Sequence, residues 1–514
     1  MIGALLGLIL ILLPGNVTTF ELENGTGVIT RTIPGEVEGL SVFIIGGTRL
    51  RDAETQGLEA MALEAAMAGG GEFPGERWRE VIDRTRAELT GSYNYDFSRL
   101  HLRCLAEDMP LLLSGLLQCL TEPELSETSV ERARRHAVAQ LSMQMVEPDD
   151  RVWLVANEGF MPAGHPYLLR PEGTVETVRS FTADQMRSLL EARIRGGNIL
   201  VTHAGPTEPE ELRSMLENSF GGLPPGADEP ASVAPLGASR DTMIVREMDA
   251  TTTYAVVKFK APPAGHPDLP AFQAAMMVAD ELVWQVLRTD NALTYAAGAG
   301  VTTTYTENWG YMYVTTSSPH LACSLLTEVL RTVALGEVDP EMMRGVVRTQ
   351  VTLDGIRAQT MDTQCWLMGA GAISAGHWSI LFDAAQRFGN LTPPDISSAV
   401  RRWADTASWG IITGSPADLD ITGPIPLGIH PMNEQGLVAL NGSIQVLFPG
   451  SRSETVVLTD DLTGGAYALV GDRALRLIAQ GASRASVQGV LSHEGWSVRE
   501  ELPRIMVTEV GEGL

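Results

Sequence analysis

Positive charge is scarce in this chain of 514 residues, which carries 37 lysines and arginines against 63 aspartates and glutamates. The net charge of −26 disfavours partners that attract basic proteins, so we expect no affinity for nucleic acid or for an anionic membrane surface. Aromatic residues make up only 6% of the chain, but 44% are hydrophobic, which is typical of a globular protein. The length exceeds that of one ordinary core and predicts two or three domains.

Cysteine is also rare, and no C-x-x-C spacing is present. The four cysteines lie far apart in apolar surroundings, which favours buried free thiols over metal ligands or a disulfide framework; they are Cys104, Cys119, Cys323 and Cys365. They do not indicate a redox compartment.

Several catalytic motifs are missing. The sequence contains neither G-x-S-x-G nor H-E-x-x-H, and the glycine-rich stretch at residues 69–75 lacks the Lys and Ser/Thr of a P-loop. The first histidine of the chain is His101. These absences exclude the local signatures of α/β-hydrolases, of common zinc peptidases and of P-loop NTPases.

One long hydrophobic run is present, at residues 2–13. It is short for a membrane span but suits the core of a signal peptide. No basic residue precedes it, the first arginine is Arg31, and no small-x-small cleavage site occurs before Thr19. We expect residues 1–18 to be a signal peptide or hydrophobic leader. The chain is then periplasmic or secreted, or cytoplasmic if the start is misassigned, and it touches a membrane only through an uncleaved leader.

The stretch Thr55–Gly71 has the spacing of an amphipathic helix that ends at three glycines. A buried strand, a Gly-Gly turn and a polar loop precede it. One face of the predicted helix carries small and apolar side chains, with Glu59 and Glu64 elsewhere; the apolar face comprises Leu58, Met61, Ala62 and Ala65.

The same order of elements occurs twice. Asn24-Gly25 predicts a hairpin turn. In the first half we predict helices at 76–89, 108–120 and 126–145, with strands within 91–105. In the second half we predict strands at 241–248, 252–263, 294–305 and 309–318, and helices at 269–287, 320–335 and 340–353. The repetition predicts an α+β fold of two tandem homologous repeats, each an antiparallel sheet with helices packed on one face.

The predicted divisions are a first repeat at 19–220, a Pro/Gly/Ala-rich linker at 221–239, and a second repeat at 240–430. Residues 431–514 exceed the repeats. Three strands are expected there, followed by one or two short helices between Arg473 and Leu491. We interpret this segment as a small α+β or winged-helix-like appendage.

A series of short motifs resembles the pitrilysin/insulinase-type zinc metallopeptidases in order and approximate spacing. They are the residues at 148–151, Gly164-His165-Pro166-Tyr167, Gly173-Thr174, Phe181-Thr182 and the apolar strand Ile199–Gly205. The resemblance covers roughly residues 19–425. Because the Gly-His-Pro-Tyr loop is structural in that family, we expect no ligand role for His165. His203 lies inside an apolar strand, so we expect it to be a satisfied core histidine.

The family binds zinc through an inverted H-x-x-E-H motif, in which two imidazoles at i and i+4 share the metal and the glutamate activates water. The corresponding five positions here are Met61, Ala62, Leu63, Glu64 and Ala65. The family's third ligand falls near Ala139 or Gln140, and neither is a carboxylate. We therefore assign no metal ligand and no cofactor to this chain, interpret Glu64 as a solvated helix residue, and expect zinc only in a partner subunit.

Two further pairs carry over from the resemblance. Arg288 and Tyr295 match the family's R-x-x-x-x-L-x-Y pattern, in which the Arg binds the substrate backbone and the Tyr hydrogen-bonds the developing oxyanion. The alternative is a helix-terminal cation and an ordinary strand aromatic. Tyr93 and Asn94 lie where an edge strand of the family pairs with substrate, which makes them candidate substrate-binding residues.

Three functions remain open. The preferred one is a zinc-less subunit of a heteromeric peptidase, inactive alone, which gives Arg288 and Tyr295 to a zinc-bearing homologous partner that cleaves unstructured peptides. The alternative is a catalytically inactive scaffold or binding protein of the same fold, alone or self-associated. An autonomous enzyme with an unrecognised site is disfavoured, because no cluster of His, Glu and Asp at metal-binding spacing is visible.

Overall fold

A computed structural model of the chain describes residues 17–227, 233–238, 240–336, 338–381, 384–416, 419–429, 437–450, 454–462, 465–492 and 504–511. Most of the expected leader at 1–18 and part of the expected linker at 221–239 lie outside these ranges. Within them, no helix combines the length and the hydrophobicity that crossing a membrane would require.

The N-terminal repeat is built on a six-stranded sheet of order β1-β2-β6-β3-β5-β4. Only β2 and β6 run parallel. β1 and β2 form the predicted hairpin, with Gly25 at a φ of 91° in the turn. At the other end β4 pairs with β5 alone and is therefore an edge strand. The strands are β1 (Val17–Glu21), β2 (Gly27–Thr32), β3 (Val37–Ile45), β4 (Glu88–Tyr93), β5 (Phe97–Leu105) and β6 (Ile199–Gly205).

The helices of this repeat share one apolar core with the sheet. Helices α4 and α5 occur where predicted, and the Ser126 hydroxyl caps α5 by accepting from Ser129 N–H. The predicted helix over 76–89 is wrong at its end: Arg86 turns to a φ of 52° and β4 follows. The helices are α2 (Leu58–Ala66), α3 (Gly75–Thr85), α4 (Met109–Thr121), α5 (Glu127–Val146), α7 (Val175–Ser180), α8 (Ala183–Arg193) and α9 (Pro209–Ser219).

The C-terminal repeat reproduces this topology. Its sheet has the order β7-β11-β8-β10-β9, in which β7 and β11 alone run parallel and β9 is an edge strand. This confirms the predicted α+β fold of two repeats. The strands are β7 (Thr242–Glu247), β8 (Thr253–Lys260), β9 (Ala297–Val301), β10 (Trp309–Thr316) and β11 (Ser408–Thr413), and the main helices are α10 (Leu269–Val283), α11 (Pro319–Leu335), α12 (Pro340–Arg357), α14 (Ala384–Gly389) and α15 (Pro393–Trp403).

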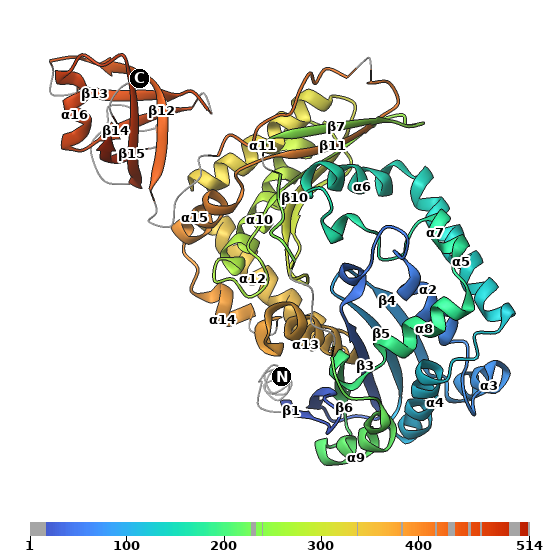
Figure 1. Cartoon of the computed structure of the whole chain (residues 1–514). Helices are drawn as coiled ribbons and strands as arrows, with labels where there is room; N and C mark the ends of the chain where they lie inside the picture. The colour runs from blue at the N-terminus through green and yellow to red at the C-terminus, as the bar shows by residue number, and fades with distance from the viewer. Residues whose placement is uncertain are drawn as a thin grey trace.

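One helix of each repeat packs on the sheet of the other repeat (Figure 1). Helix α6 (Pro148–Phe160) leaves the N-terminal repeat and packs on β7, β8 and β11. Helix α13 (Met361–Ala375) crosses in the opposite direction and packs on β3, β5 and β6. We call these contacts the α6 seam and the α13 seam. They cover the sheet faces that the sequence analysis left without helices, and they join the two repeats at two separate places.

The C-terminal segment is a closed five-stranded barrel of order β12-β13-β14-β16-β15. β14 and β16 run parallel, and one helix connects the third strand to the fourth, which is the topology of the OB-fold. The winged-helix interpretation is wrong: residues 484–491, expected as helix, belong to a strand, and residues 485–490 alternate in burial. The elements are β12 (Val438–Leu447), β13 (Thr455–Asp460), β14 (Ala466–Val470), α16 (Asp472–Ala479), β15 (Arg484–Ser492) and β16 (Arg504–Val510).

The four cysteines are free and buried, as predicted. Burial raises the pKa of each thiol to about 12, so all four are protonated at neutral pH.

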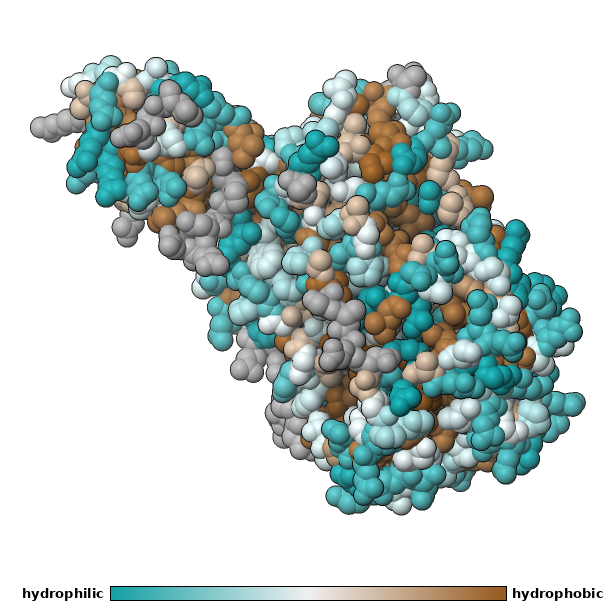
Figure 2. Space-filling view, in the orientation of Figure 1, coloured by the Kyte–Doolittle hydropathy of each residue, from teal (hydrophilic) through white to brown (hydrophobic). Residues whose placement is uncertain are grey.

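In a space-filling view, hydrophilic side chains dominate the helical surface of the N-terminal repeat, and hydrophobic side chains are visible between the two repeats (Figure 2).

Candidate functional site

The positions of the inverted zinc motif lie on α2, with the side chains of Met61 and Ala65 in the core at 2% and 1% exposure. A methyl group cannot coordinate zinc, and a buried thioether does not replace an imidazole in a tetrahedral site. On α5, Ala139 and Gln140 supply no carboxylate. No group of three His, Cys, Asp or Glu side chains in the described residues is arranged to hold a metal. The residues present therefore do not fit the family's zinc ion.

Glu64 has partners that the sequence analysis missed. The Tyr93 hydroxyl donates to Glu64 Oε2 at 3.4 Å, and His136 Nδ1 on α5 lies 4.0 Å from Glu64 Oε1. Burial, followed by the charge of Glu64, raises the pKa of Tyr93 and keeps it a neutral donor. The solvated-glutamate interpretation is thus only partly right, because the carboxylate joins α2 to the edge strand.

A cavity of about 530 Å³ opens between α2, α3, α5 and β4. Its wall includes Glu64, Arg79 and Arg132 together with Leu89, Thr90 and Gly91 of the strand. Because β4 pairs on one side only, its free edge can accept an extended peptide by strand addition. Asn94 does not line this cavity: its side-chain oxygen accepts from Asp96 N–H and Phe97 N–H and closes the β4–β5 turn. Sequence reasoning placed Asn94 on the strand, and the structure places it in the turn.

The second predicted pair lies in the C-terminal repeat, where α10 continues as a π-helical segment, η7 (Trp284–Asp290). The Arg288 guanidinium stacks over the Trp284 ring, 4.7 Å from its centroid. Ala292 follows with a φ of 52°, and Tyr295 is 91% exposed before β9 begins. Tyr295 is therefore not an ordinary strand aromatic. π-Helical turns and positive φ at non-glycine residues concentrate at functional sites.

The two predicted pairs are not brought into contact within the part of the chain that the structure describes. Tyr93 and Asn94 belong to the N-terminal sheet, whereas Arg288 and Tyr295 belong to the C-terminal one. One chain thus does not unite them into a single site.

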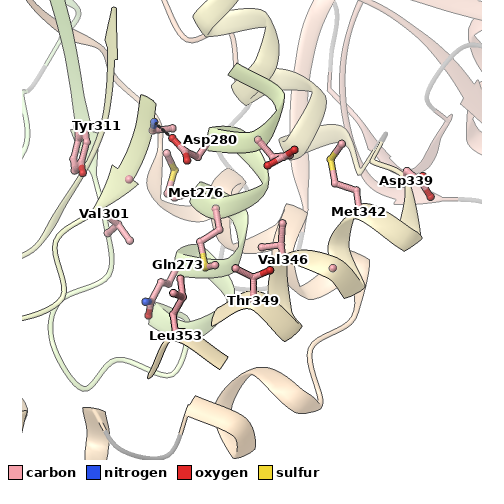
Figure 3. Close-up of a pocket in the computed structure, with 15 residues that line it drawn as sticks. Gln273, Met276, Asp280, Val301, Tyr311, Asp339, Met342, Val346, Thr349 and Leu353 are labelled. Atoms are coloured by element: carbon pink, nitrogen blue, oxygen red, sulfur yellow. Dashed lines mark hydrogen bonds between the residues drawn. The ribbon is translucent and has the colours of Figure 1, made fainter. Parts of the chain in front are cut away.

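The C-terminal repeat has a groove of its own, which sequence reasoning missed (Figure 3). This cavity of about 660 Å³ lies between α10, α12 and the edge strand β9, the counterparts of α2, α5 and β4. Asp280 accepts a hydrogen bond from Ala299 N–H at 2.8 Å, and burial raises the pKa of Asp280. The described residues that line this cavity include three carboxylates and no lysine or arginine; the carboxylates are Asp280, Glu281 and Asp339. The signal in the sequence was the Asp280-Glu281 pair inside an otherwise apolar helix.

The loops that follow the edge strands meet between the repeats. Tyr95 stacks on Tyr167, with ring centroids 4.3 Å apart, and packs edge-on against Tyr305. The buried Asp96 carboxylate accepts from the Tyr167 hydroxyl at 2.8 Å and from Thr306 N–H at 2.7 Å, and lies 3.4 Å from the Arg49 guanidinium. One buried charge therefore connects both repeats.

Both His165 and His203, for which no ligand role is expected, are buried. His165 Nδ1 accepts from Tyr167 N–H, and its Nε2 lies 2.9 Å from the Ala234 carbonyl oxygen. His203 is fully buried between the Thr30 hydroxyl and the Glu38 carboxylate. Neither imidazole faces a cavity described above, which confirms their structural role.

A family model described as "Peptidase M16 inactive domain" matches residues 180–346. Similar proteins include cytochrome b-c1 complex subunit 1 of Bos taurus, 21% identical over 50% of this chain and 53% of that protein. An uncharacterized zinc protease of Rickettsia felis is 21% identical over 62% of this chain and 77% of its own length. A probable mitochondrial-processing peptidase subunit beta of Schizosaccharomyces pombe is 23% identical over 52% and 59%. The chain thus spans about half of the bovine relative.

Solved structures share the fold. A protease from Helicobacter pylori superposes with a TM-score of 0.71 at 14% identity, over 77% of this chain and 99% of that one. The periplasmic protease PqqL from Escherichia coli gives a TM-score of 0.67 at 13% identity, over 78% and 46%. The family model over residues 180–346, the relatives and the repeated α+β fold agree in their similarity to the pitrilysin/insulinase-type peptidases of family M16, and the positions of the inverted zinc motif are degenerate in this chain.

Proposed function

We propose that this chain is the zinc-less subunit of a heteromeric M16 peptidase and lends Arg288 and Tyr295 to a zinc-bearing homologous partner that hydrolyses unstructured peptides. The observation that carries this proposal is the exposure of the pair. Tyr295 is 91% exposed, and the Arg288 side chain is also exposed, with its guanidinium over the Trp284 ring. Neither side chain is buried in its own fold, so both are accessible to a second chain.

Two further observations support a shared site. The chain lacks metal ligands on α2 but keeps an open edge strand beside it, and the predicted pairs lie apart in the two repeats. Two of the relatives are named as subunits of larger assemblies. We propose that the protein is periplasmic or secreted, because residues 1–18 are expected to be a leader. One structural neighbour is a periplasmic protease.

The first prediction concerns hydrolysis of a mixed pool of unstructured peptides by this chain, by the zinc-bearing partner, and by both together. Only the mixture should cleave, and Arg288→Ala combined with Tyr295→Phe should lower the rate roughly 100-fold or more, as loss of transition-state donors does. Arg344→Ala, which removes an exposed arginine of the same repeat, is the matched control and should cleave at the wild-type rate.

A second function is favoured by the two grooves beside β4 and β9, which suit capture of extended peptides without hydrolysis. The chain is then an inactive scaffold or binding protein. Equal cleavage by the double variant and wild type would support this function and overturn the shared site. Activity of the chain alone would reject both.

The second prediction concerns zinc. A site that held zinc would raise the free energy of unfolding by about 2.7 kcal/mol at 100 times its Kd. Because the ligand positions on α2 are Met61 and Ala65, we expect the thermal midpoint of the isolated chain to stay the same with added ZnSO₄ and with a chelator. A zinc-dependent rise in the midpoint, with saturable binding in calorimetry, would contradict the zinc-less assignment.

A further inference from the structure

Among the buried basic groups of the seams, two titrate below the range of arginine and are not used by the proposed function: Lys258 at the α6 seam and His101 at the α13 seam. We propose that the two seams form a proton-sensitive latch, in which proton uptake by Lys258 and His101 releases α6 and α13 and lets the repeats separate. The inference is independent of the proposed function, since it concerns only contacts within this chain.

Lys258 lies on β8, 2% exposed, beneath α6. Its Nζ donates to the neutral Asn157 side-chain oxygen and lies 4.6 Å from the Trp309 ring centroid and 5.9 Å from that of Trp153. No carboxylate pairs with it in the described residues. Cation–π contacts and one amide recover only part of the hydration that a buried ammonium loses. Burial accordingly lowers the pKa of Lys258 to about 7.

The other titratable groups at the α6 seam do not offset this loss. Tyr311, opposite Lys258 on β10, has a pKa raised by burial and is neutral. The Tyr313 hydroxyl donates to Asp149, and Arg246 pairs with Glu158 at 2.7 Å, which leaves these carboxylates engaged elsewhere. Lys258 is thus the buried base at this seam whose protonation favours separation.

His101 lies on β5 under the start of α13. Its Nδ1 is 2.9 Å from the Ser41 hydroxyl, and its Nε2 is 3.3 Å from Asp362 Oδ1 without the geometry of a hydrogen bond. Asp362 is already engaged by the Arg99 guanidinium. Burial first, and then the charges of Arg99 and Arg103, lower the pKa of His101 to about 4, against the opposing effect of Asp362. Cys365, also on α13, is a protonated thiol.

Proton uptake by either group weakens closure of the two repeats. A base whose pKa is lower in the closed chain than in the open one binds fewer protons when closed, so closure weakens as pH falls between the two values. For Lys258 this window runs from its ordinary value near 10.5 down to about 7, and for His101 from near 6.5 down to about 4. The overall charge acts oppositely down to the isoelectric point near 4.7, because an acidic chain repels itself less as pH drops.

The test is hydrogen exchange of the full chain, followed in peptides from α6 and α13 and corrected for the intrinsic effect of pH. Between pH 9 and pH 7 the protection of α6 should fall at least tenfold, since one linked proton changes the opening equilibrium up to tenfold per pH unit. Lys258→Met should reduce this change to less than twofold. Lys260→Met is the matched control: Lys260 pairs with Asp405 at 3.0 Å on the same strand, and its variant should respond as wild type does.

Between pH 6.5 and pH 4.5, protection of α13 should fall similarly in wild type, with circular dichroism showing that the fold persists. His101→Gln should flatten this response, whereas His136→Gln, at an exposed histidine, should not. If Lys258→Met fails to fold, Asn157→Asp replaces it, because a carboxylate beside the amine should hold the α6 seam closed at pH 7. The proposal is overturned if wild-type protection is independent of pH, or if the seam variants respond like their controls.

Discussion

Replacing Asp96 with alanine is expected to lower the free energy of unfolding by about 3–5 kcal/mol, the range typical of breaking a buried ion pair. The fully buried Asp96 carboxylate accepts from the Tyr167 hydroxyl and from Thr306 N–H and pairs with Arg49. Alanine leaves a buried guanidinium without its counter-charge and two donors without an acceptor. It also removes a direct polar connection between the repeats.

The measurement is the thermal and urea midpoint of Asp96→Ala, together with limited proteolysis between the repeats. Glu158→Ala is the matched control, because Glu158 also reaches across to the other repeat, through Arg246, but at an exposed pair worth at most about 1 kcal/mol. The double variant Asp96→Ala/Tyr167→Phe should lose less stability than the sum of the two single variants, because both changes remove the same hydrogen bond, from the Tyr167 hydroxyl to Asp96. Equal midpoints for Asp96→Ala and Glu158→Ala would refute the central role of Asp96.

Local signals in the sequence predicted local structure well. The Asn24-Gly25 turn, the helix over 108–120 and the capped helix after Ser126 depend on neighbouring residues, and all three form as predicted. Errors occurred where a contact distant in sequence decides the conformation. Residues 484–491 have mixed apolar spacing, and pairing with β12 and β16 makes them a strand. Likewise, the α2 glutamate Glu59 is buried because its side chain accepts from Ser98 on β5.

The candidate site shows the same difference between features set by neighbouring residues and features set by contacts distant in sequence. The Arg288/Tyr295 spacing was readable because it is a short motif, although it gave no sign of the π-helical turn that carries Arg288. The α13 contact of Arg99 with Asp362 and the α6 contact of Lys258 with Asn157 join residues more than 100 positions apart. No periodicity within a single segment encodes such pairs, so neither seam was predictable.

The second large effect is expected at Gly410 on β11, where α6 packs closely against the C-terminal sheet. A Cβ atom at this position would lie 2.4 Å from the backbone nitrogen of Ala156 and 2.6 Å from its Cα. Because these are backbone atoms, a rotamer change cannot relieve the overlap, and α6 must move off the sheet. We expect Gly410→Ala to destabilise the chain by about 3 kcal/mol, at the upper end of typical overpacking.

Hydrogen exchange should show this loss first in α6, whereas the N-terminal sheet should keep its protection until the whole chain unfolds. Gly345→Ala on α12 is the control: its Cβ would meet nothing within 4 Å, and alanine in a helix interior adds about 0.5–1 kcal/mol of stability. If Gly410→Ala matches wild type in both readouts, the α6 seam is loose enough to absorb a methyl group. In that case tight packing at Gly410 would not hold α6 against the sheet, and the α6 seam would depend on its polar contacts alone. A selective loss in α6 would instead identify glycine as the residue that allows the N-terminal repeat to hold the C-terminal one.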